Sequence, residues 1–253
     1  MSPVVLLHSG GMSSRQWRAL EGALAGRWPV VAPDLLGSGS STPFIDATPY
    51  AMQMDVDALL PAIRRVAPAH LVGHSFGGLL ALKIALQEPR LVRSLALYEP
   101  PAFGVLRGFP EEAAHAELAA LARVPVFTDE ELGGTEPWMR VFVDYWNGPG
   151  AWDQLPSGSR AAFLRTGRKV FREVLAITAD GTTAADVARL GVPVLLMAGG
   201  TSPLAERRVM ARLAEALPHA SVVTFEDAGH MGPLTHASQV SAAIVRHLES
   251  VER

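Results

Sequence analysis

A serine in a glycine-rich turn is the residue best suited to chemistry in this sequence. It is Ser75, in the letters GHSFG at residues 73–77, which follow an apolar run and precede a helical pattern. The two glycines let strand and helix approach closely, so the serine hydroxyl projects from a sharp turn. The start of the helix favours negative charge that develops on a substrate oxygen. The pattern predicts a serine nucleophile, although a serine that only caps the helix would give the same letters.

A serine hydroxyl needs a base that takes its proton while it attacks. The sequence offers His230, which comes after Gly229 and the last apolar run of strand type. The other histidines lie inside backbone turns or have no motif around them. His70 and His74 are spaced four residues apart, but on a strand and turn they do not converge on a metal ion. We therefore expect no metal site.

Composition narrows the class of protein. The chain has 253 residues, of which 49% are hydrophobic and 19% charged, and a formal net charge of −3. It has no cysteine, which excludes thiol catalysis and zinc–thiolate sites, and no basic run that would bind nucleic acid. It shows neither a signal-peptide pattern nor an apolar run long enough to cross a bilayer. We expect a cytoplasmic protein that acts on a small molecule, with no nucleic-acid or membrane partner and with its oligomeric state left open.

Apolar runs of strand type alternate with helical patterns along the chain. The expected strands are 4–7, 29–32, 70–72, 94–98, 192–198 and 221–225, and the expected helices are 17–25, 52–66, 76–87, 206–216 and 237–248. Such alternation is typical of a parallel sheet whose crossovers are right-handed. The predicted fold class is therefore α/β, with a mostly parallel, doubly wound sheet.

Residues 101–190 interrupt this alternation. They show no strong strand pattern, only helical stretches at 111–123, 138–145 and 159–177. An insertion of this length usually forms a lid or a binding element. We expect a core of residues 1–100 and 191–253 and a helical cap of residues 101–190.

Three aromatic residues of the expected cap share one helix face. Trp138, Phe142 and Trp146 recur at intervals of four residues. Such a stripe either packs the cap onto the core or forms an aromatic wall over an apolar substrate.

The chain resembles the α/β-hydrolase family over essentially its whole length. Besides the serine turn, three motifs carry the likeness in the family's order: HSGG at residues 8–11, DLLGSGS at residues 34–40, and Gly229-His230. The second motif lacks the third glycine of a dinucleotide-binding loop, so we expect no cofactor. The family usually has an antiparallel hairpin before its first parallel strand, and this chain begins almost on that strand.

The resemblance implies roles for particular residues. His230 matches the place of the family's catalytic histidine. The backbone N–H groups of Phe76 and Gly10 match the oxyanion hole, with Gly11 as the alternative to Gly10. A serine nucleophile argues against the branches of the family that use a carboxylate in its place.

The acid that supports the histidine departs from the family's usual pattern. It normally follows the strand expected at 192–198, but this chain has Ser202 there. Some members carry the acid at the end of the strand after the nucleophile helix, where this chain has Glu99. We therefore expect Glu99 to support His230, with Asp227 or Asp180 as alternatives.

These residues predict a serine hydrolase that cleaves a carboxylic ester or lactone of a small, largely apolar substrate through an acyl-enzyme on Ser75. The same residues are compatible with carbon–carbon bond hydrolysis, thioester hydrolysis, acyl transfer or a lyase reaction, because the substrate is chosen by cap side chains. A ligand-binding protein without activity would be marked by the loss of Ser75 or His230, and both are present.

Overall fold

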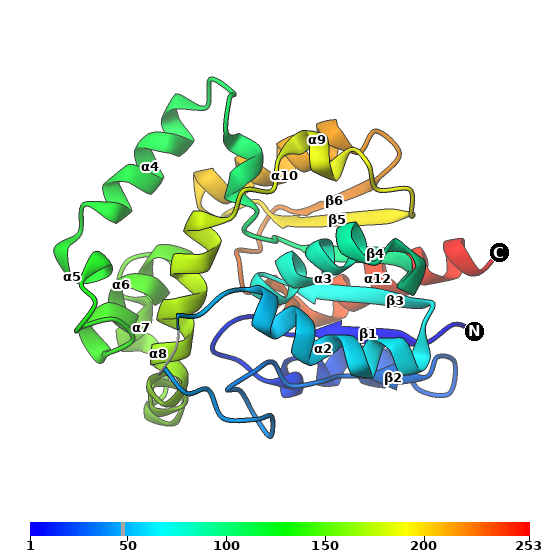
Figure 1. Cartoon of the computed structure of the whole chain (residues 1–253), viewed down its shortest axis with the longest axis horizontal. Coiled ribbons are helices and arrows are strands. Elements are labelled where there is room, and N and C mark those ends of the chain that lie inside the picture. Colours follow the sequence, from blue (N-terminus) through cyan, green and yellow to red (C-terminus); the bar gives the residue numbers. More distant parts are fainter. Residues whose placement is uncertain (47–48) are drawn as a thin grey trace.

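The computed structural model describes residues 1–46 and 49–253. In this part of the chain six strands form one sheet in the order β2-β1-β3-β4-β5-β6 (Figure 1). They are β1 (Val4–Leu7), β2 (Val30–Val31), β3 (Ala69–His74), β4 (Val92–Tyr98), β5 (Val194–Gly199) and β6 (Ser221–Phe225). Every neighbouring pair is parallel. The predicted class, a parallel and doubly wound α/β sheet, is confirmed.

Helices cover both faces of the sheet (Figure 1). α2 (Gln53–Val66), α3 (Phe76–Gln87) and α10 (Leu204–Ala216) share an apolar cluster with one face, and α1 (Arg18–Leu24) and α12 (Ala237–Glu252) share another with the opposite face. β1 shows why both faces can be covered. Val5 and Leu7 belong to the first cluster, whereas Val4 and Leu6 belong to the second. Because successive strand side chains point to opposite faces, a continuous apolar run is buried on both sides.

The predicted bounds agree with the structure for some elements and differ for others. The structure reproduces the expected strands 4–7 and 221–225 and the helix 76–87 without change. β3 is longer than expected, because its polar histidines are buried and continue the ladder as far as His74. Several short helices give no periodic signal and were not expected, among them η1 (Ser14–Trp17), η2 (Pro89–Leu91), α9 (Ala184–Val187) and α11 (Gly232–Thr235).

The chain between β4 and β5 is helical in the structure. It contains η3 (Phe103–Leu106), α4 (Glu112–Ala122), α5 (Pro125–Thr128), α6 (Glu136–Asn147), α7 (Ala151–Gln154), α8 (Ser157–Ala179) and then α9. We call α4–α8 the cap helices, because they lie beyond the carboxyl ends of the strands (Figure 1). At either end of this stretch, Val105 of η3 and Val187 of α9 pack into the same cluster as Val209 of α10.

The cap helices also have an apolar cluster of their own. Its buried members are Trp138, Met139, Val143, Trp152, Val170 and Phe171. Trp138 is completely buried, and its ring stacks between those of Phe127 and Phe142 at centroid distances of 5.4 and 5.2 Å. Its indole N–H donates to the carbonyl oxygen of Phe127 at 3.0 Å, which satisfies the polar end of the ring.

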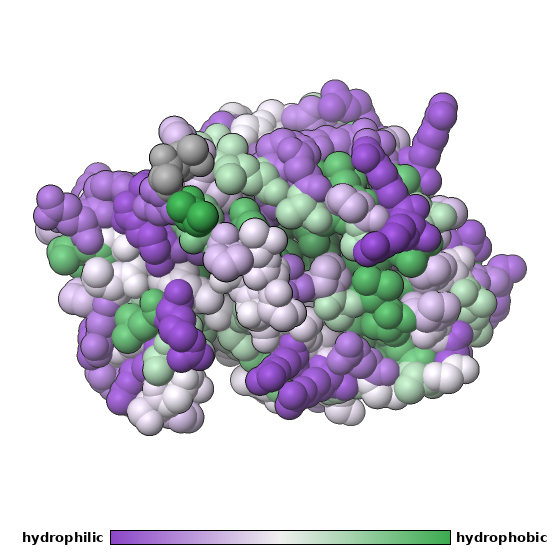
Figure 2. All heavy atoms as spheres, turned by 60° about the horizontal axis from the view of Figure 1, so that its bottom comes forward, coloured by the Kyte–Doolittle hydropathy of each residue, from purple (hydrophilic) through white to green (hydrophobic). Residues whose placement is uncertain are grey.

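Polar and apolar side chains are interspersed on the face of the molecule in Figure 2. The most exposed large apolar side chains, Ile45 and Val222 among them, come from separate segments of the chain. Single exposed apolar residues of this kind are normal on a protein surface. Among the described residues, no helix has the length and apolar character needed to cross a bilayer.

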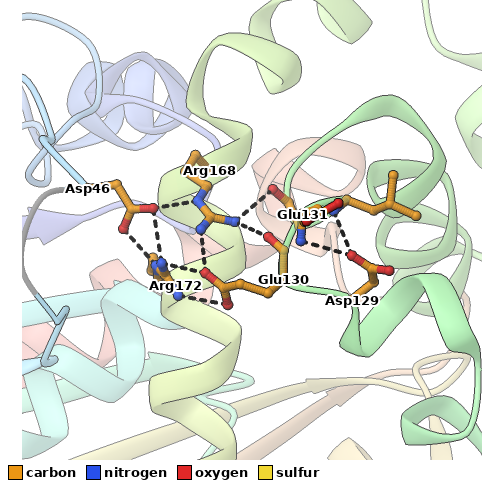
Figure 3. A network of polar contacts seen from close by, with 8 residues as sticks. Asp46, Asp129, Glu130, Glu131, Arg168 and Arg172 are labelled. Atoms are coloured by element: carbon orange, nitrogen blue, oxygen red, sulfur yellow. Dashed lines mark hydrogen bonds and ion pairs between the residues drawn. The ribbon is translucent and has the colours of Figure 1, made fainter.

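An ion-pair network joins the outer side of α8 to the segment that precedes α2 (Figure 3). Arg172 donates to Asp46 from Nε at 2.7 Å and from Nη2 at 3.0 Å, and Arg168 Nε donates to Asp46 at 2.5 Å. Glu130, which lies between α5 and α6, also pairs with both arginines. Asp46 therefore connects the core side of the chain to a cap helix through shared, partly exposed ion pairs.

We expect Asp46→Asn to lower the free energy of unfolding by about 0.5–1 kcal/mol at low salt, because the pairs are partly solvated. Hydrogen bonds from Arg172 and then Arg168 hold the pKa of Asp46 below its usual range. The folded-state pKa is thus below the unfolded one, so this stability is present above the unfolded pKa and is lost as pH falls through the folded pKa. Urea unfolding at several pH values and at about 1 M NaCl measures both effects.

The matched control is Glu88→Gln, which removes the more exposed pair between Arg64 and Glu88, joined at 2.8 Å. It should change the free energy of unfolding less than Asp46→Asn does. An equal loss in the two variants, or a loss in Asp46→Asn that salt does not reduce, would contradict the proposed contribution of the network.

Candidate active site

Ser75 occupies the sharp turn between β3 and α3. Its backbone has φ 52° and ψ −124°, a conformation that a residue with a side chain rarely adopts. The Ser75 N–H donates to the carbonyl oxygen of Tyr98 in the neighbouring strand at 2.9 Å. Two residues on, a side chain at Gly77 would overlap the carbonyl oxygen of His8, so only glycine allows α3 to begin this close to β1. The local sequence therefore holds the serine at the carboxyl end of the sheet.

Glu99 leaves the end of β4 in a similar backbone conformation, with φ 44°. Its side chain is completely buried. Oε1 accepts a hydrogen bond from the Gly199 N–H at 2.6 Å, and Oε2 lies 2.7 Å from His230 Nδ1. The carboxyl group is thus fixed at both oxygens, and one of them faces the histidine.

His230 joins the other two residues. Its Nε2 lies 2.9 Å from Ser75 Oγ, on the opposite side of the ring from the Glu99 contact. The hydrogen-bond pattern assigns a proton to Nδ1, which donates to Glu99, and leaves Nε2 free to accept from the serine hydroxyl. The structure therefore brings all three residues of the expected triad into one hydrogen-bonded chain.

The loop that carries His230 is fastened by two neighbouring rings. The Tyr98 hydroxyl donates to the carbonyl oxygen of Gly229 at 2.8 Å, and His74 Nε2 donates to the carbonyl oxygen of His230 at 2.8 Å. Burial, and next the proximity of His230, lower the pKa of His74 well below its usual value, so this ring is a neutral donor. His74 and Tyr98 thus fix the backbone at Gly229 and His230.

Trp146 of α6 stacks on the His230 ring, with centroids 3.9 Å apart and an interplanar angle of 22°. Phe142, one turn earlier, lines the same cavity. Trp138 does not, because its ring is enclosed by Phe127 and Phe171 in the cap cluster. Of the expected aromatic stripe, two members face the cavity and the third packs the cap.

A cavity of about 260 Å³ lies between these residues and the cap helices. Its wall is largely apolar, with side chains of Phe103, Leu118, Phe142, Phe163, Val174 and Ile177. Ser75, His230, Phe76 and Gly10 form part of the same wall, whereas Gly11 does not. The Gly10 N–H and the Phe76 N–H make no hydrogen bond with any described residue, so both are available to a ligand.

His8 shapes the loop that carries Gly10. Its Nδ1 donates to the carbonyl oxygen of Ser9 at 2.8 Å, and its Nε2 accepts from the Leu35 N–H at 3.0 Å. Burial lowers the pKa of His8 to about 4, so the ring stays neutral and keeps one donor and one acceptor. These contacts make His8 a structural residue of this loop.

The structure does not bring the alternative acids to His230. Asp227 is exposed and makes no side-chain hydrogen bond within residues 1–46 and 49–253. Asp180 instead pairs with Lys83 Nζ at 2.6 Å. Ser202, which stands where the family usually has its acid, is buried, and its hydroxyl has no partner among the described residues.

Sequence reasoning missed Glu173 of α8, which lines the cavity and is almost fully buried. It pairs with Lys169, one helical turn earlier, at 2.7 Å. On a long helix a lysine and a glutamate four residues apart usually form a solvated pair, and only their position beside the apolar residues of α8 could have indicated burial. Among the described residues no group of His, Asp and Glu side chains is arranged to hold a metal ion.

A parallel sheet with a serine at a strand-to-helix turn, next to a histidine and a buried carboxyl group, defines a hydrolase of the α/β class. A sequence model of the alpha/beta hydrolase family matches residues 4–243, and the chain belongs to this family. The resemblance found in the sequence is confirmed, and the protein is a hydrolytic enzyme.

Relatives in the family have different activities. The chain is 29% identical, over 97% of its length, to the dihydrolipoyllysine-residue acetyltransferase component of the acetoin cleaving system of Cupriavidus necator, but it spans only 63% of that protein. It is also 29% identical to the pimeloyl-(acyl-carrier protein) methyl ester esterase of Chromobacterium violaceum, over 98% of this chain and 94% of the relative. The crystal structure of the enol-lactonase from Burkholderia xenovorans has the same fold, with a TM-score of 0.72 and 21% identity over 98% of this chain and 92% of that one.

The two tryptophans of α6 should differ in what they contribute. Trp138→Leu should lower the free energy of unfolding by about 2–4 kcal/mol, because it leaves a cavity in the cap cluster. Trp146→Leu should cost less than about 1 kcal/mol but slow phosphonylation of Ser75 by a fluorophosphonate roughly 3- to 10-fold, because the ring face no longer stabilises the positive charge on His230. Urea unfolding and labelling rates measure the two effects. Equal losses of stability with unchanged labelling rates would show that both rings only pack.

Proposed function

We propose that the protein hydrolyses carboxylic esters or lactones of small, largely apolar acyl groups through an acyl-enzyme on Ser75. The observation that carries the proposal is the chain from Ser75 Oγ to His230 Nε2 at 2.9 Å and from His230 Nδ1 to Glu99 Oε2 at 2.7 Å, at the wall of an apolar cavity. The esterase among the relatives supports the same class of reaction.

In the first half of the reaction, Ser75 Oγ attacks the carbonyl carbon of the substrate while its proton moves to His230 Nε2. The developing negative charge on the carbonyl oxygen is received by the free N–H groups of Gly10 and Phe76. Glu99, ionised and buried, stabilises the imidazolium through Nδ1–H. The carbon–oxygen bond to the leaving group then breaks, and His230 gives its proton to the departing oxygen.

In the second half, a water molecule enters the position of the leaving group. His230 Nε2 takes a proton from the water, whose oxygen attacks the acyl carbon. The bond to Ser75 breaks, the serine recovers its proton from His230, and the carboxylic acid leaves. Trp146 covers one face of His230 and stabilises its positive charge in both halves of the reaction.

Within this proposal residues 101–190 act as a cap on a core of residues 1–100 and 191–253. Phe142 and Trp146 of the cap form part of the wall that the acyl group contacts. An apolar cavity of about 260 Å³ favours short hydrocarbon-rich acyl groups over long or highly charged ones. The cap side chains therefore set the size of the substrate, while the core residues carry out the bond changes.

Ser75→Ala should abolish both labelling by a fluorophosphonate and hydrolysis of p-nitrophenyl butyrate, because no other group is placed to attack. Its free energy of unfolding should stay within about 1 kcal/mol of wild type, since the hydroxyl contributes little packing. Intact mass spectrometry, ester hydrolysis and urea unfolding measure the three quantities. Covalent labelling or turnover that persists in a folded Ser75→Ala variant would refute the proposed nucleophile.

Glu99→Gln should lower kcat by roughly 10³–10⁴, because the amide offers His230 no negative charge and promotes the wrong tautomer. Asp227→Asn is the matched control: this carboxyl group is exposed and should leave kcat within about 3-fold of wild type. Steady-state kinetics of both variants on the same ester provide the comparison. Near-wild-type turnover in Glu99→Gln would exclude Glu99 as the supporting acid.

A further inference from the structure

The cavity wall contains a carboxyl group that the proposed mechanism does not use. It belongs to Glu173, the only carboxylic acid among the described residues that line the cavity, and its residue is 2% exposed. Oε1 accepts a hydrogen bond from Lys169 Nζ at 2.7 Å. Oε2 makes no hydrogen bond with any described residue. A carboxyl oxygen without a partner among the described residues, on a buried side chain at the wall of a cavity, is a feature that a ligand would satisfy.

Oε2 lies against Gly10, whose N–H is one of the two assigned to the oxyanion. A side-chain carbon at Gly10 would overlap Glu173 Oε2 and would lie 3.9 Å from Phe76 Cβ. Glycine is therefore required at position 10 for this close approach of the carboxyl group. A substrate whose carbonyl oxygen binds the Gly10 and Phe76 N–H groups would bring the next atoms of its acyl group close to Oε2.

The hydrogen bonds around Lys169 favour the protonated form of Glu173 over that of Asp55. Lys169 Nζ also donates to Asp55 at 2.8 Å, and Asp55 accepts two further hydrogen bonds, from the Leu36 N–H at 3.1 Å and the Tyr50 hydroxyl at 2.5 Å. One lysine cannot neutralise two buried carboxylates, and Glu173 has one donor against three for Asp55. Burial, followed by the nearby Asp55 charge, raises the pKa of Glu173 to about 7 although Lys169 opposes this.

Three titratable groups around Glu173, namely Tyr50, Lys169 and His8, keep one protonation state near neutral pH. Burial and Asp55 raise the pKa of the Tyr50 hydroxyl, so it stays neutral. Burial lowers the pKa of Lys169, but Glu173 and Asp55 outweigh it and hold the ammonium in its charged form. His8, from the end of β1, is neutral above about pH 4, and His230 faces the cavity from the other side.

We propose that neutral Glu173 donates a hydrogen bond from Oε2 to an ether, hydroxyl or keto oxygen on the acyl group, and thereby selects oxygen-substituted acyl groups over hydrocarbon ones. This inference rests on the proposed acyl-enzyme chemistry at Ser75. Ionised Glu173 has no proton to donate and places a negative charge next to the oxyanion. Both the selection and the rate should therefore fall as Glu173 ionises.

Two esters of equal chain length test the selection: p-nitrophenyl methoxyacetate, in which one chain carbon is replaced by oxygen, and p-nitrophenyl butyrate. For each ester kcat/KM is divided by the rate constant of its hydrolysis by hydroxide, which removes the intrinsic difference in reactivity. Wild type should prefer the methoxyacetate roughly 5- to 20-fold below pH 7 and lose this preference as pH rises above about 7, where Glu173 ionises.

Two variants, Glu173→Gln and Glu173→Leu, distinguish the effect of a hydrogen-bond donor at this position from the effect of its charge. In Glu173→Gln the amide oxygen accepts from Lys169 and the amide N–H₂ donates into the cavity, so the preference should persist at every pH. Glu173→Leu should lose it. Val174→Ala, one residue away on the same cavity wall, is the matched control and should change both rates alike. If a thermal melt shows that Glu173→Leu is not folded, the proposal is tested by the difference in pH dependence between wild type and Glu173→Gln.

Carboxyl ¹³C NMR of glutamate-labelled protein gives a readout independent of activity. A resonance that titrates near pH 7 in wild type and is absent from Glu173→Gln supports the proposal. The absence of such a resonance, a wild type without ester preference, or the same pH dependence in wild type and Glu173→Gln would overturn it.

The activity of Ser75→Ala shows which of the two proposals has failed. If one of the contradicting results occurs while Ser75→Ala is inactive, only the inference on Glu173 fails. If Ser75→Ala remains active, the proposed nucleophile fails, and the NMR titration still tests the proton on Glu173.

Discussion

The register between β3 and β4 fixes the geometry on which the site depends. His74 pairs with Tyr98 at the ends of the two strands, so the next residues, Ser75 and Glu99, leave the sheet at the same level. Both have positive φ, which turns their side chains into the space above the strand ends. Because strand side chains alternate between faces, a slip of one residue would move one of them to the opposite face of the sheet. The hydrogen bond from the Ser75 N–H to the Tyr98 carbonyl oxygen stabilises this register against such a slip.

Four of the buried carboxyl groups among the described residues, Asp55, Glu99, Glu173 and Glu206, differ in the number of hydrogen bonds that they accept. Asp55 accepts three and Glu99 contacts a backbone N–H and the His230 ring. Glu173 accepts one, and Glu206, on α10, accepts none from the described residues. Burial, and next the charge of Glu99, raise the pKa of Glu206 well above its usual range. A carboxylate in a protein interior is stable only where donors replace the lost water, so the pKa is raised in the least satisfied groups, Glu173 and Glu206.

α8 connects the cap to the core through two different faces. Arg168 and Arg172 point outward to Asp46 (Figure 3), whereas Lys169 and Glu173 point inward to Asp55 and the cavity. The outward pairs are partly solvated and contribute modestly to stability. The inward contacts are shielded from water, so loss of Lys169 would leave the buried Asp55 carboxyl group without its cation. The same helix thus joins the cap helices to the core and supplies a polar group to the cavity wall.

The sequence alone determined the features that depend on local backbone pattern. Continuous apolar runs predicted the parallel sheet, and the glycines around Ser75 predicted the turn, because close approach of backbone atoms excludes other residues there. Gly229-His230 was recognised by its place in the order of motifs. These signals are short-range, so they are visible before the chain is folded.

Only the tertiary structure decided which side chains meet. The family resemblance favoured Glu99 and left Asp227 and Asp180 as alternatives. The structure shows that Glu99 lies against His230, because β4 ends beside β3. Trp138 and Trp146 belong to the same helical stripe, yet one is enclosed by the cap and the other stacks on the histidine. The pair formed by Lys169 and Glu173 has the spacing of an ordinary surface ion pair. Burial and hydrogen-bond partners depend on contacts between segments far apart in the chain, and residue spacing along one segment carries no information about them.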